Sequence, residues 1–234
     1  MREATLDARL KAAAEYVRQG AVFADIGTDH AYLPIYLLKR GIISRAVAAD
    51  VAEGPLNCAV SHAKEFSLED KIDFRLTDGL DGLDALGITD VAICGMGGEL
   101  ISNLIDRAPF LKNSNIRLIL QPMSKQEILR KYLAKNGFKI RSESLGSAAG
   151  HTYSCICAEY CGEPYELDAL TLYIGEPIIE TETDRKNLAL LLDKKEKAFK
   201  KRLEGKKKAG KSADEEEALL TQCEERRKKL YEDT

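Results

Sequence analysis

Apolar and polar residues follow one another in blocks along the first two thirds of the chain, and the blocks predict a regular succession of strands and helices. Short apolar runs that end in a carboxylate or a glycine are typical of buried strands, whereas apolar spacings of three and four residues indicate helices. The runs predict strands over 21–26, 45–50, 72–77, 90–94, 117–121, 138–145 and 152–160. The spacings predict helices over 5–19, 31–40, 55–66, 98–107 and from 124 to 136.

Residues with special backbone preferences stand at the ends of these segments. Gly20 and Gly41 end the first two helices, and Pro34 lies in the first turn of the second. Ser124 with Glu127 three residues later has the spacing of a capping box, in which each side chain bonds the other residue's backbone N–H. The fifth helix therefore starts at Ser124 in this interpretation.

The order of the segments predicts the fold class. Strands and helices alternate until two adjacent strands close the region, which indicates a mainly parallel sheet with an antiparallel hairpin at one edge. Seven strands in this order match the class I methyltransferase variant of the Rossmann-like, doubly wound α/β fold. A dinucleotide-binding dehydrogenase would alternate helix and strand throughout.

From residue 164 the character of the chain changes. Within 184–204, Leu188, Leu192, Phe199 and Leu203 are apolar, and Lys195 fills the position expected between Leu192 and Phe199, so the steps of four, three, four and four fit a coiled-coil seam. A loop over 205–212 and a second helix from 213 complete an antiparallel helical hairpin. We therefore predict two domains, a small-molecule-binding domain over 1–163 and a coiled-coil hairpin over 164–234.

The composition narrows the class of protein. Of the 234 residues, 44% are hydrophobic and 31% are charged, and no apolar run reaches the roughly 18–20 residues of a membrane span. The first residues lack an apolar signal segment, so we expect a cytoplasmic protein without membrane contact, and a monomer. Residues 185–234 carry a net charge of +5 and the rest a net charge of −8. A basic appendage on an acidic domain indicates a polyanionic partner, although a solvated helix pair would have similar charges.

The cysteines offer one alternative chemistry. Cys155, Cys157 and Cys161 follow His151 closely enough to suggest a metal cluster. Cys155 and Cys157 alternate with an apolar residue, however, as on one face of a strand, and a second Cys-x-x-Cys pair is missing. We therefore predict neither a metal site nor disulfides.

The first strand delivers the most informative loop, Asp25-Ile-Gly-Thr-Asp-His30. A pyrophosphate-binding loop would carry Gly-x-Gly-x-x-Gly here, whereas this loop has a single glycine, Gly27, between Asp25 and Asp29. Two carboxylates repel a pyrophosphate and favour a cationic sulfonium or ammonium group, both of which S-adenosylmethionine carries. Gly27 lets the backbone approach such a ligand closely. The alternative is an ordinary turn from strand to helix.

Polar or glycine-rich turns also follow the next strands. Asp50 ends the second strand, where a carboxylate can accept both hydroxyls of a ribose. Asp78-Gly79 ends the third, where the adenine amino group would bond the side chain or backbone, with Leu80 beside the ring. Gly95-Met-Gly-Gly98 follows the fourth strand, and its glycines would expose carbonyls and leave room for a flat base. Gln121-Pro122 lies beside the same cleft.

Three segments, ADIGTDHAYLP at 24–34, ICGMGGELI at 93–101 and LILQPMS at 118–124, together with the hairpin, resemble the bacterial TrmK family. The resemblance covers essentially the whole chain. It implies a tRNA (adenine-22-N1)-methyltransferase with S-adenosyl-L-methionine as donor and tRNA as partner. Asp50 departs mildly from the pattern, since some members have Glu there. The predicted cofactor-binding residues are Asp25, Gly27, Thr28, His30, Asp50, Val51, Asp78, Gly79, Leu80, Gly95, Met96 and Gly97.

Adenine N1 carries a lone pair, so no base is needed before attack, and catalysis is mainly positioning. Asp29 is the predicted catalytic residue, because a carboxylate would stabilise the cationic product, with the Gly95 carbonyl as a second acceptor. Tyr32 and Tyr153 are candidate stacking platforms for an everted base. We interpret His62 as a surface residue and His151 as a loop residue, both without function.

The hairpin would bind tRNA phosphates without sequence specificity. The basic residues predicted for this contact are Lys194, Lys195, Lys200, Lys201, Arg202 and Lys206–Lys208. Two other functions remain open at this point. One is a methyltransferase acting on a small molecule or protein, and the other is a non-catalytic RNA-binding scaffold.

Overall fold

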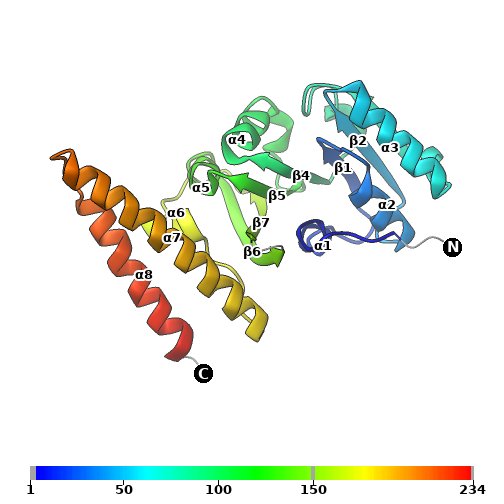
Figure 1. Ribbon diagram of the computed structural model, residues 1–234. Coiled ribbons are helices and arrows are strands. Elements are labelled where there is room, and N and C mark those ends of the chain that lie inside the picture. The colour runs from blue at the N-terminus through cyan, green and yellow to red at the C-terminus, as the bar shows by residue number, and fades with distance from the viewer. Residues whose placement is uncertain (1–3, 149–150, 233–234) are drawn as a thin grey trace.

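A computed structural model describes residues 4–148 and 151–232, and within them the chain forms one mixed sheet flanked by helices, with two long helices at one end (Figure 1). The sheet has seven strands in the order β3-β2-β1-β4-β5-β7-β6. Its strands are β1 Val22–Ile26, β2 Arg45–Asp50, β3 Ile72–Leu76, β4 Asp90–Gly97, β5 Arg117–Ser124, β6 Phe138–Ala148 and β7 His151–Tyr160. The helices are α1 Ala8–Ala14, α2 Tyr32–Lys39, α3 Glu53–Glu65, α4 Gly98–Asp106, α5 Gln126–Lys135, α6 Ala169–Ile174, α7 Glu182–Lys208 and α8 Asp214–Glu232.

The strand pairing confirms the predicted Rossmann-like class. Neighbouring strands from β1 to β5 run parallel, whereas β7 pairs antiparallel with both β5 and β6. Alternate residues of each strand face opposite sides of the sheet. Ala24 and Ile26 join one apolar core, and Phe23 joins the other, so both faces of the sheet are covered. The parallel strands bring their carboxyl ends to a single edge, where ligands of such folds bind.

Several predicted boundaries are wrong. The first helix is Ala8–Ala14, shorter than the predicted 5–19, and β4 and β5 are each longer at their carboxyl ends than predicted. Ser124 does not cap α5, because β5 continues through it and Ser124 pairs with Gly97 of β4. The N-cap of α5 is Lys125, in the left-handed region and without a side-chain cap. The first half of the predicted loop over 205–212 is helical, since α7 continues to Lys208. Lysines in this last turn suit the negative end of the helix dipole.

The helices α7 and α8 form the predicted antiparallel hairpin. Arg185, near the start of α7, donates from Nη1 to the carbonyl of Leu230 at the end of α8, over 2.7 Å. At the other end, Arg202 Nη2 lies 2.9 Å from Glu216 Oε1. The apolar seam between the helices extends to Leu145 of β6, so the hairpin packs on the edge strand of the sheet. The short helix α6, which the sequence pattern did not predict, lies at this junction.

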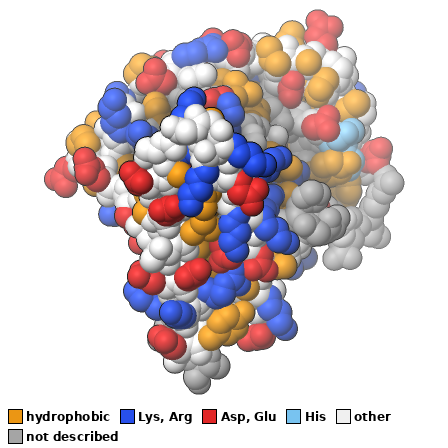
Figure 2. All heavy atoms as spheres, turned by 60° about the vertical axis from the view of Figure 1, so that its left-hand side comes forward, with side chains coloured by type: hydrophobic (Ala, Val, Ile, Leu, Met, Phe, Trp, Pro, Cys, Tyr) orange, Lys and Arg blue, Asp and Glu red, His pale blue; other side chains and the backbone are white. Residues whose placement is uncertain are grey.

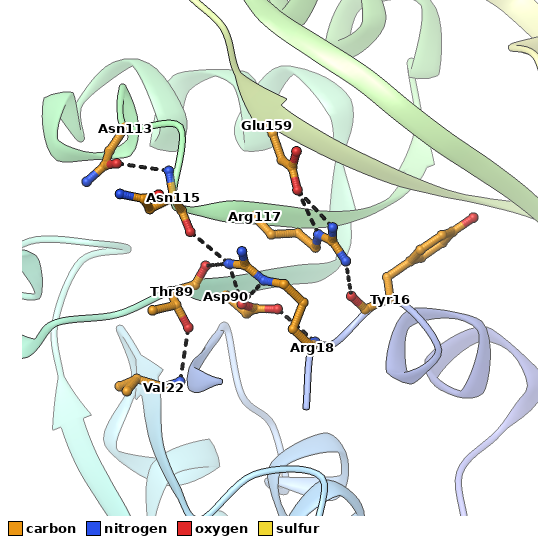
Figure 3. Close-up of polar contacts among 9 residues, drawn as sticks. All are labelled: Tyr16, Arg18, Val22, Thr89, Asp90, Asn113, Asn115, Arg117 and Glu159. Atoms are coloured by element: carbon orange, nitrogen blue, oxygen red, sulfur yellow. Dashed lines mark hydrogen bonds and ion pairs between the residues drawn. The ribbon is translucent and has the colours of Figure 1, made fainter. Parts of the chain in front are cut away.

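The segment after α1 is tied to the amino ends of the strands by Arg18 (Figure 3). Its Nε donates to Asp90 Oδ1 over 2.9 Å and its backbone N–H donates to Asp90 Oδ2 over 3.0 Å. Its Nη2 donates to the carbonyls of Thr89 and Asn115. Asp90 is fully buried and begins β4. These bonds hold α1 against the sheet from the end opposite the carboxyl edge.

Candidate active site

Asp25 lies near the end of β1, almost buried beneath the loop that follows. Its exposed fraction is 8%, and Thr28 Oγ1 donates to Asp25 Oδ2 over 2.8 Å. Burial, which disfavours the charged form, raises the pKa of Asp25 to about 6. The Thr28 hydrogen bond and the Arg9 charge oppose this rise, and the Asp50 charge adds to it. Asp25 and Thr28, both predicted to bind the cofactor, are therefore bonded directly to each other.

Gly27 and Met96 meet across the carboxyl ends of β1 and β4. Gly27 has a φ of +75°, and a Cβ there would collide with the terminal methyl of Met96. Both features favour glycine, because other residues are strained at this φ and Met96 would have to move. The N–H groups of Gly27 and Thr28 both donate to the carbonyl of Ala49 at the end of β2, over 2.8 and 3.0 Å. The loop is thereby attached to the strand that ends in Asp50.

Asp29 and His30 lie at the exposed rim of the loop. Asp29 Oδ2 is 3.5 Å from His30 Nε2, and the Asp29 side chain is 74% exposed. The predicted catalytic carboxylate is thus accessible from solvent, unlike Asp25, and the two acids of the loop differ sharply in environment.

His62 belongs to this rim, which corrects its interpretation as a residue merely on the surface. Its Nδ1 lies 2.8 Å from the His30 carbonyl, which can only accept, so Nδ1 carries the proton. Tyr32 packs between His30 and His62, with ring centroids 5.1 and 4.9 Å away. Tyr32 is also 43% exposed, as a stacking platform requires. No residue spacing in the sequence indicates that α3 returns to the loop before α2.

The ends of β2 and β3 carry Asp50 and Asp78 in different settings. Asp50 Oδ1 accepts the N–H of Ala52 over 2.9 Å and is half-buried. The following Val51 is 70% exposed, beside the carboxylate. Asp78 is exposed and forms an ion pair with Arg107, whose Nη1 is 2.9 Å from Asp78 Oδ2.

The residues after Asp78 lie deeper in the molecule. Gly79 is half-buried against Leu104 of α4, and Leu80, only 4% exposed, belongs to the apolar core. The structure thus leaves the Asp50 carboxylate open beside an exposed apolar residue, whereas the Asp78 side chain has a cation as its partner.

The predicted loop at Gly95–Gly98 is instead an irregular continuation of β4 to Gly97. The pairing with β5 shifts between Cys94 and Met96 and again at Gly97, as in a β-bulge, which commonly occurs beside active sites. A Cβ on Gly98 would strike the backbone carbonyl of Lys125, so only glycine fits where α4 begins. The bulge leaves Gly95 exposed at the carboxyl edge.

Gln121 and Arg9 complete this side of the site. The fully buried Gln121 side chain accepts at Oε1 from Gly95 N–H and from Arg9 Nη1, each over 3.1 Å. The sequence indicates Gln121 beside the cleft but not Arg9, because an arginine on the polar side of an amphipathic helix carries no further signal.

The remaining candidates, Tyr153 and His151, belong to the start of β7, which runs antiparallel to β5 and therefore begins on the side of the carboxyl ends of the parallel strands. Tyr153 is half-buried in β7 and pairs with Gly146 of β6. The side chain of His151 lies outside the described residues. In the described part of the chain, no group of three or more His, Cys, Asp and Glu side chains could hold a metal ion. A search of the same residues finds no helix with the length and apolarity needed to cross a membrane.

The hairpin uses several of its predicted RNA-binding cations internally. Lys206 and Lys207 form ion pairs with Glu216 and Glu217 of α8, over 2.6 and 2.8 Å. Lys195 lies over the ring of Tyr173, and Arg202 bonds Glu216. Lys194, Lys200, Lys201 and Lys208 are exposed and have no ion pair within residues 4–148 and 151–232. Figure 2 shows the hairpin side with basic side chains interleaved with acidic ones.

Comparisons with known proteins agree with this geometry. A family model described as a methyltransferase domain matches residues 6–156. A tRNA (adenine(22)-N(1))-methyltransferase of Bacillus subtilis is 33% identical over 175 residues, which are 75% of this chain and 74% of the relative. The crystal structure of the B. subtilis m1A22 tRNA methyltransferase TrmK has a TM-score of 0.77 at 28% identity, covering 98% of this chain and 99% of that one. A Streptococcus pneumoniae protein solved in complex with S-adenosyl-L-methionine has a TM-score of 0.77 at 31% identity, covering 92% and 100%.

Proposed function

The chain belongs to the family of tRNA (adenine(22)-N(1))-methyltransferases, and we propose that it transfers a methyl group from S-adenosyl-L-methionine to N1 of adenine 22 in tRNA. The observation that carries this function is the set of acids around a single-glycine turn at the carboxyl edge of the sheet. Asp25, Asp29 and Asp50 come together there without the glycines of a pyrophosphate loop. Such a set suits a ligand with ribose hydroxyls and positive groups.

The donor chemistry fits the residues of this edge. Asp50, half-buried with one oxygen bonded to the backbone, accepts the ribose hydroxyls. Asp25, bonded to Thr28, would hold the methionine ammonium, with Gly27 and Met96 beside it. When bound, S-adenosyl-L-methionine supplies an electrophilic methyl group on a sulfonium.

The other predicted cofactor-binding residues surround this centre. His30 and Val51 lie at its rim, and Asp78, Gly79 and Leu80 lie at the adenine end. Because Arg107 already pairs with the Asp78 side chain, the backbone of Asp78–Gly79 is the better group for the adenine amine. Gly95 and Gly97 form the acceptor side.

Asp29 is the proposed catalytic residue. The attacking N1 needs no base, because its lone pair is free, and the methylated adenine becomes cationic and more acidic at its amine. A carboxylate on the exposed rim can approach this developing charge, whereas the buried Asp25 cannot. Tyr32, exposed and held by His30 and His62, offers a ring on which an everted base stacks.

The hairpin of residues 164–234 is the proposed tRNA-contacting domain. Its exposed lysines without ion pairs in the described residues, Lys194, Lys200, Lys201 and Lys208, are the best candidates for phosphate contacts. The internally paired Lys206 and Lys207 would have to exchange one partner for another and so contribute less. We further propose that the protein acts in the cytoplasm, where tRNA is modified, and as a monomer.

Two measurements together test this function against its rivals. Calorimetry measures donor binding to the full chain, and label transfer from S-adenosyl-L-methionine measures methylation of an unmodified tRNA transcript. Donor binding with transfer to tRNA is expected. Donor binding without transfer to tRNA would favour a small-molecule or protein acceptor, and lack of donor binding would favour a non-catalytic RNA-binding scaffold.

A further inference from the structure

One buried carbonyl oxygen at the acceptor side accepts hydrogen bonds from two different parts of the chain. Gln121 Oε1, at the end of β5, receives Nη1 of Arg9 from α1 and the backbone N–H of Gly95 from β4, each over 3.1 Å. The amide nitrogen of Gln121 donates in turn to the Pro122 carbonyl over 3.3 Å. Both ends of the carboxamide are therefore engaged, and its orientation is fixed.

Arg9 reaches this position from the first turn of a helix whose following segment is anchored to the sheet. The N-cap of α1 is Asp7, which accepts the N–H of Leu10 and lies 3.4 Å from Arg9 Nη2. Beyond the other end of the helix, Arg18 is bonded to Asp90 and Thr89 at the amino ends of the strands (Figure 3). The Arg9 side chain therefore lies at the carboxyl ends of the strands, whereas the segment that follows α1 is fixed at their amino ends. The Arg9 side chain is only 23% exposed there.

We propose that Arg9 is a positioning residue for methyl transfer, which holds Gln121 and the Gly95 backbone in one arrangement and places a fixed positive charge beside Asp25. This inference rests on the proposed function, because the reacting base must enter beside Gly95. Gly95 is exposed and sits where the pairing of β4 with β5 shifts register. The Arg9–Gln121 contact connects this irregular strand end, through the Gly95 N–H, to α1 and β5.

The charge of Arg9 also acts on Asp25. The groups that face Asp25 are Thr28 from the loop, Asp50 from β2, Cys94 from β4 and Arg9 from α1, and Arg9 is the cation among them. Burial holds the pKa of Asp25 at about 6, and the Arg9 charge lowers it. Removing that charge would raise the pKa further, so that more of Asp25 is protonated near neutral pH. A protonated Asp25 loses its attraction for an ammonium group.

Three variants of the full chain separate these roles. Arg9→Met removes the charge and the hydrogen bond, and Arg9→Lys keeps the charge but not the planar set of donors. Lys11→Met is the matched control, because Lys11 is an exposed residue of the same helix. The measurements are kcat with saturating tRNA transcript and donor, donor affinity at pH 8.5 and 6.5, and the NMR titration of the Asp25 carboxyl carbon. Thermal unfolding checks that each variant folds.

We expect Arg9→Met to lower kcat by about tenfold or more, because a small misplacement of reacting groups is enough for such a loss. Its donor affinity should be near that of the unaltered protein at pH 8.5 and fall more steeply toward pH 6.5, with a raised Asp25 titration midpoint. Arg9→Lys should lose kcat but keep the midpoint. Lys11→Met should change neither. A residue that only stabilises the fold would not shift the Asp25 midpoint.

The inference is overturned if Arg9→Met keeps kcat within about twofold, or if its Asp25 midpoint does not move. Should Arg9→Met fail to fold, Arg9→Lys decides, because unchanged turnover in that variant contradicts the positioning role. Failure of the proposed function looks different, since the unaltered protein itself would then transfer no methyl group to tRNA.

Discussion

Arg130 and Glu143 form an ion pair inside the protein, with Arg130 Nη2 2.9 Å from Glu143 Oε2 and neither side chain more than 2% exposed. Arg130 comes from α5 and Glu143 from β6. Arg130 Nη1 also donates to the Leu172 carbonyl in α6, and the Glu143 carbonyl accepts the N–H of Ile178. The pair therefore lies where the sheet meets the chain that leads into the hairpin.

Glu143→Gln should strongly destabilise the protein. The substitution keeps the shape of the side chain but leaves the buried Arg130 charge without its counter-ion, which typically costs about 3–5 kcal/mol of unfolding free energy. Arg141→Gln is the control, because it breaks a surface ion pair with Glu159 and should cost at most about 1 kcal/mol. Urea unfolding measures both. Equal losses in the two variants would contradict the account of the buried pair.

Asp25→Asn should make the protein without donor more stable at neutral pH. The pKa of Asp25 is raised from 3.8 to about 6 in the folded state, so the folded protein binds its proton more tightly than the unfolded chain. The contribution of this group to stability is therefore favourable below pH 4 and falls as the pH rises toward 6 and above. The shift corresponds to roughly 3 kcal/mol at pH 7.

Urea unfolding of both proteins at pH 5 and pH 7.5 measures this effect. Asp25→Asn should lose this part of the pH dependence and should bind the donor more weakly. Asp29→Asn serves as the control, because Asp29 is exposed and its substitution should leave the unfolding free energy nearly unchanged. A variant at position 25 that is less stable than the unaltered protein at pH 7.5 would show that burial does not strain this carboxylate.

Asp29→Ala should reduce kcat by about tenfold to a thousandfold with saturating donor and tRNA, because a group that stabilises developing charge acts in the transition state. Asp50→Ala is the comparison and should mainly weaken donor binding, since its contacts with ribose are the same before and during transfer. Steady-state kinetics distinguishes the two patterns. If Asp29→Ala restores full turnover once the donor saturates, Asp29 only holds the donor and the catalytic role is wrong.

Replacing Lys200 and Lys201 with alanine should weaken tRNA binding without affecting donor binding. Each lost phosphate contact lowers the slope of log affinity against log salt concentration by about 1. Both side chains are exposed on α7 and have no ion pair in the described part of the chain. Lys64→Ala with Lys71→Ala, near the opposite edge of the sheet, removes the same charge as a control. An equal loss of affinity in both double variants would indicate general charge attraction rather than contact with the hairpin.

Much of the fold could be predicted because its signals are local. Apolar runs ending in Asp25 and Asp50 marked the strand ends, and parallel topology alone brings such ends to one edge. The spacing of Ser124 and Glu127 predicts a helix cap, but Ser124 instead pairs with Gly97 and continues the strand. The helical turn past Gly205 is not evident from the sequence, because Lys206 and Lys207 meet their partners on α8 only once the hairpin has closed.

The site was less predictable, because it depends on contacts between distant residues. Arg9 and Gln121 are 112 positions apart, and the sequence around either residue does not indicate that the two are in contact. The sequence pattern indicates a surface residue at His62, and only the packing of α3 brings its ring to the His30 carbonyl. The burial of Asp25, which raises the pKa of that carboxyl group, likewise arises only when the loop folds over β1, whereas Asp29 stays exposed. The residue types of the first loop indicate S-adenosyl-L-methionine as the methyl donor. Packing determines which acid of the loop is buried and which is exposed.

The central claim is methyl transfer to one position of tRNA, and the most direct test uses two transcripts. Labelled S-adenosyl-L-methionine is incubated with the protein and either an unmodified tRNA or the same tRNA with adenine 22 replaced by guanine. We predict label on the first transcript, as 1-methyladenine after digestion, and none on the second. Equal labelling of both transcripts, or label on neither while the donor binds, would contradict the claim.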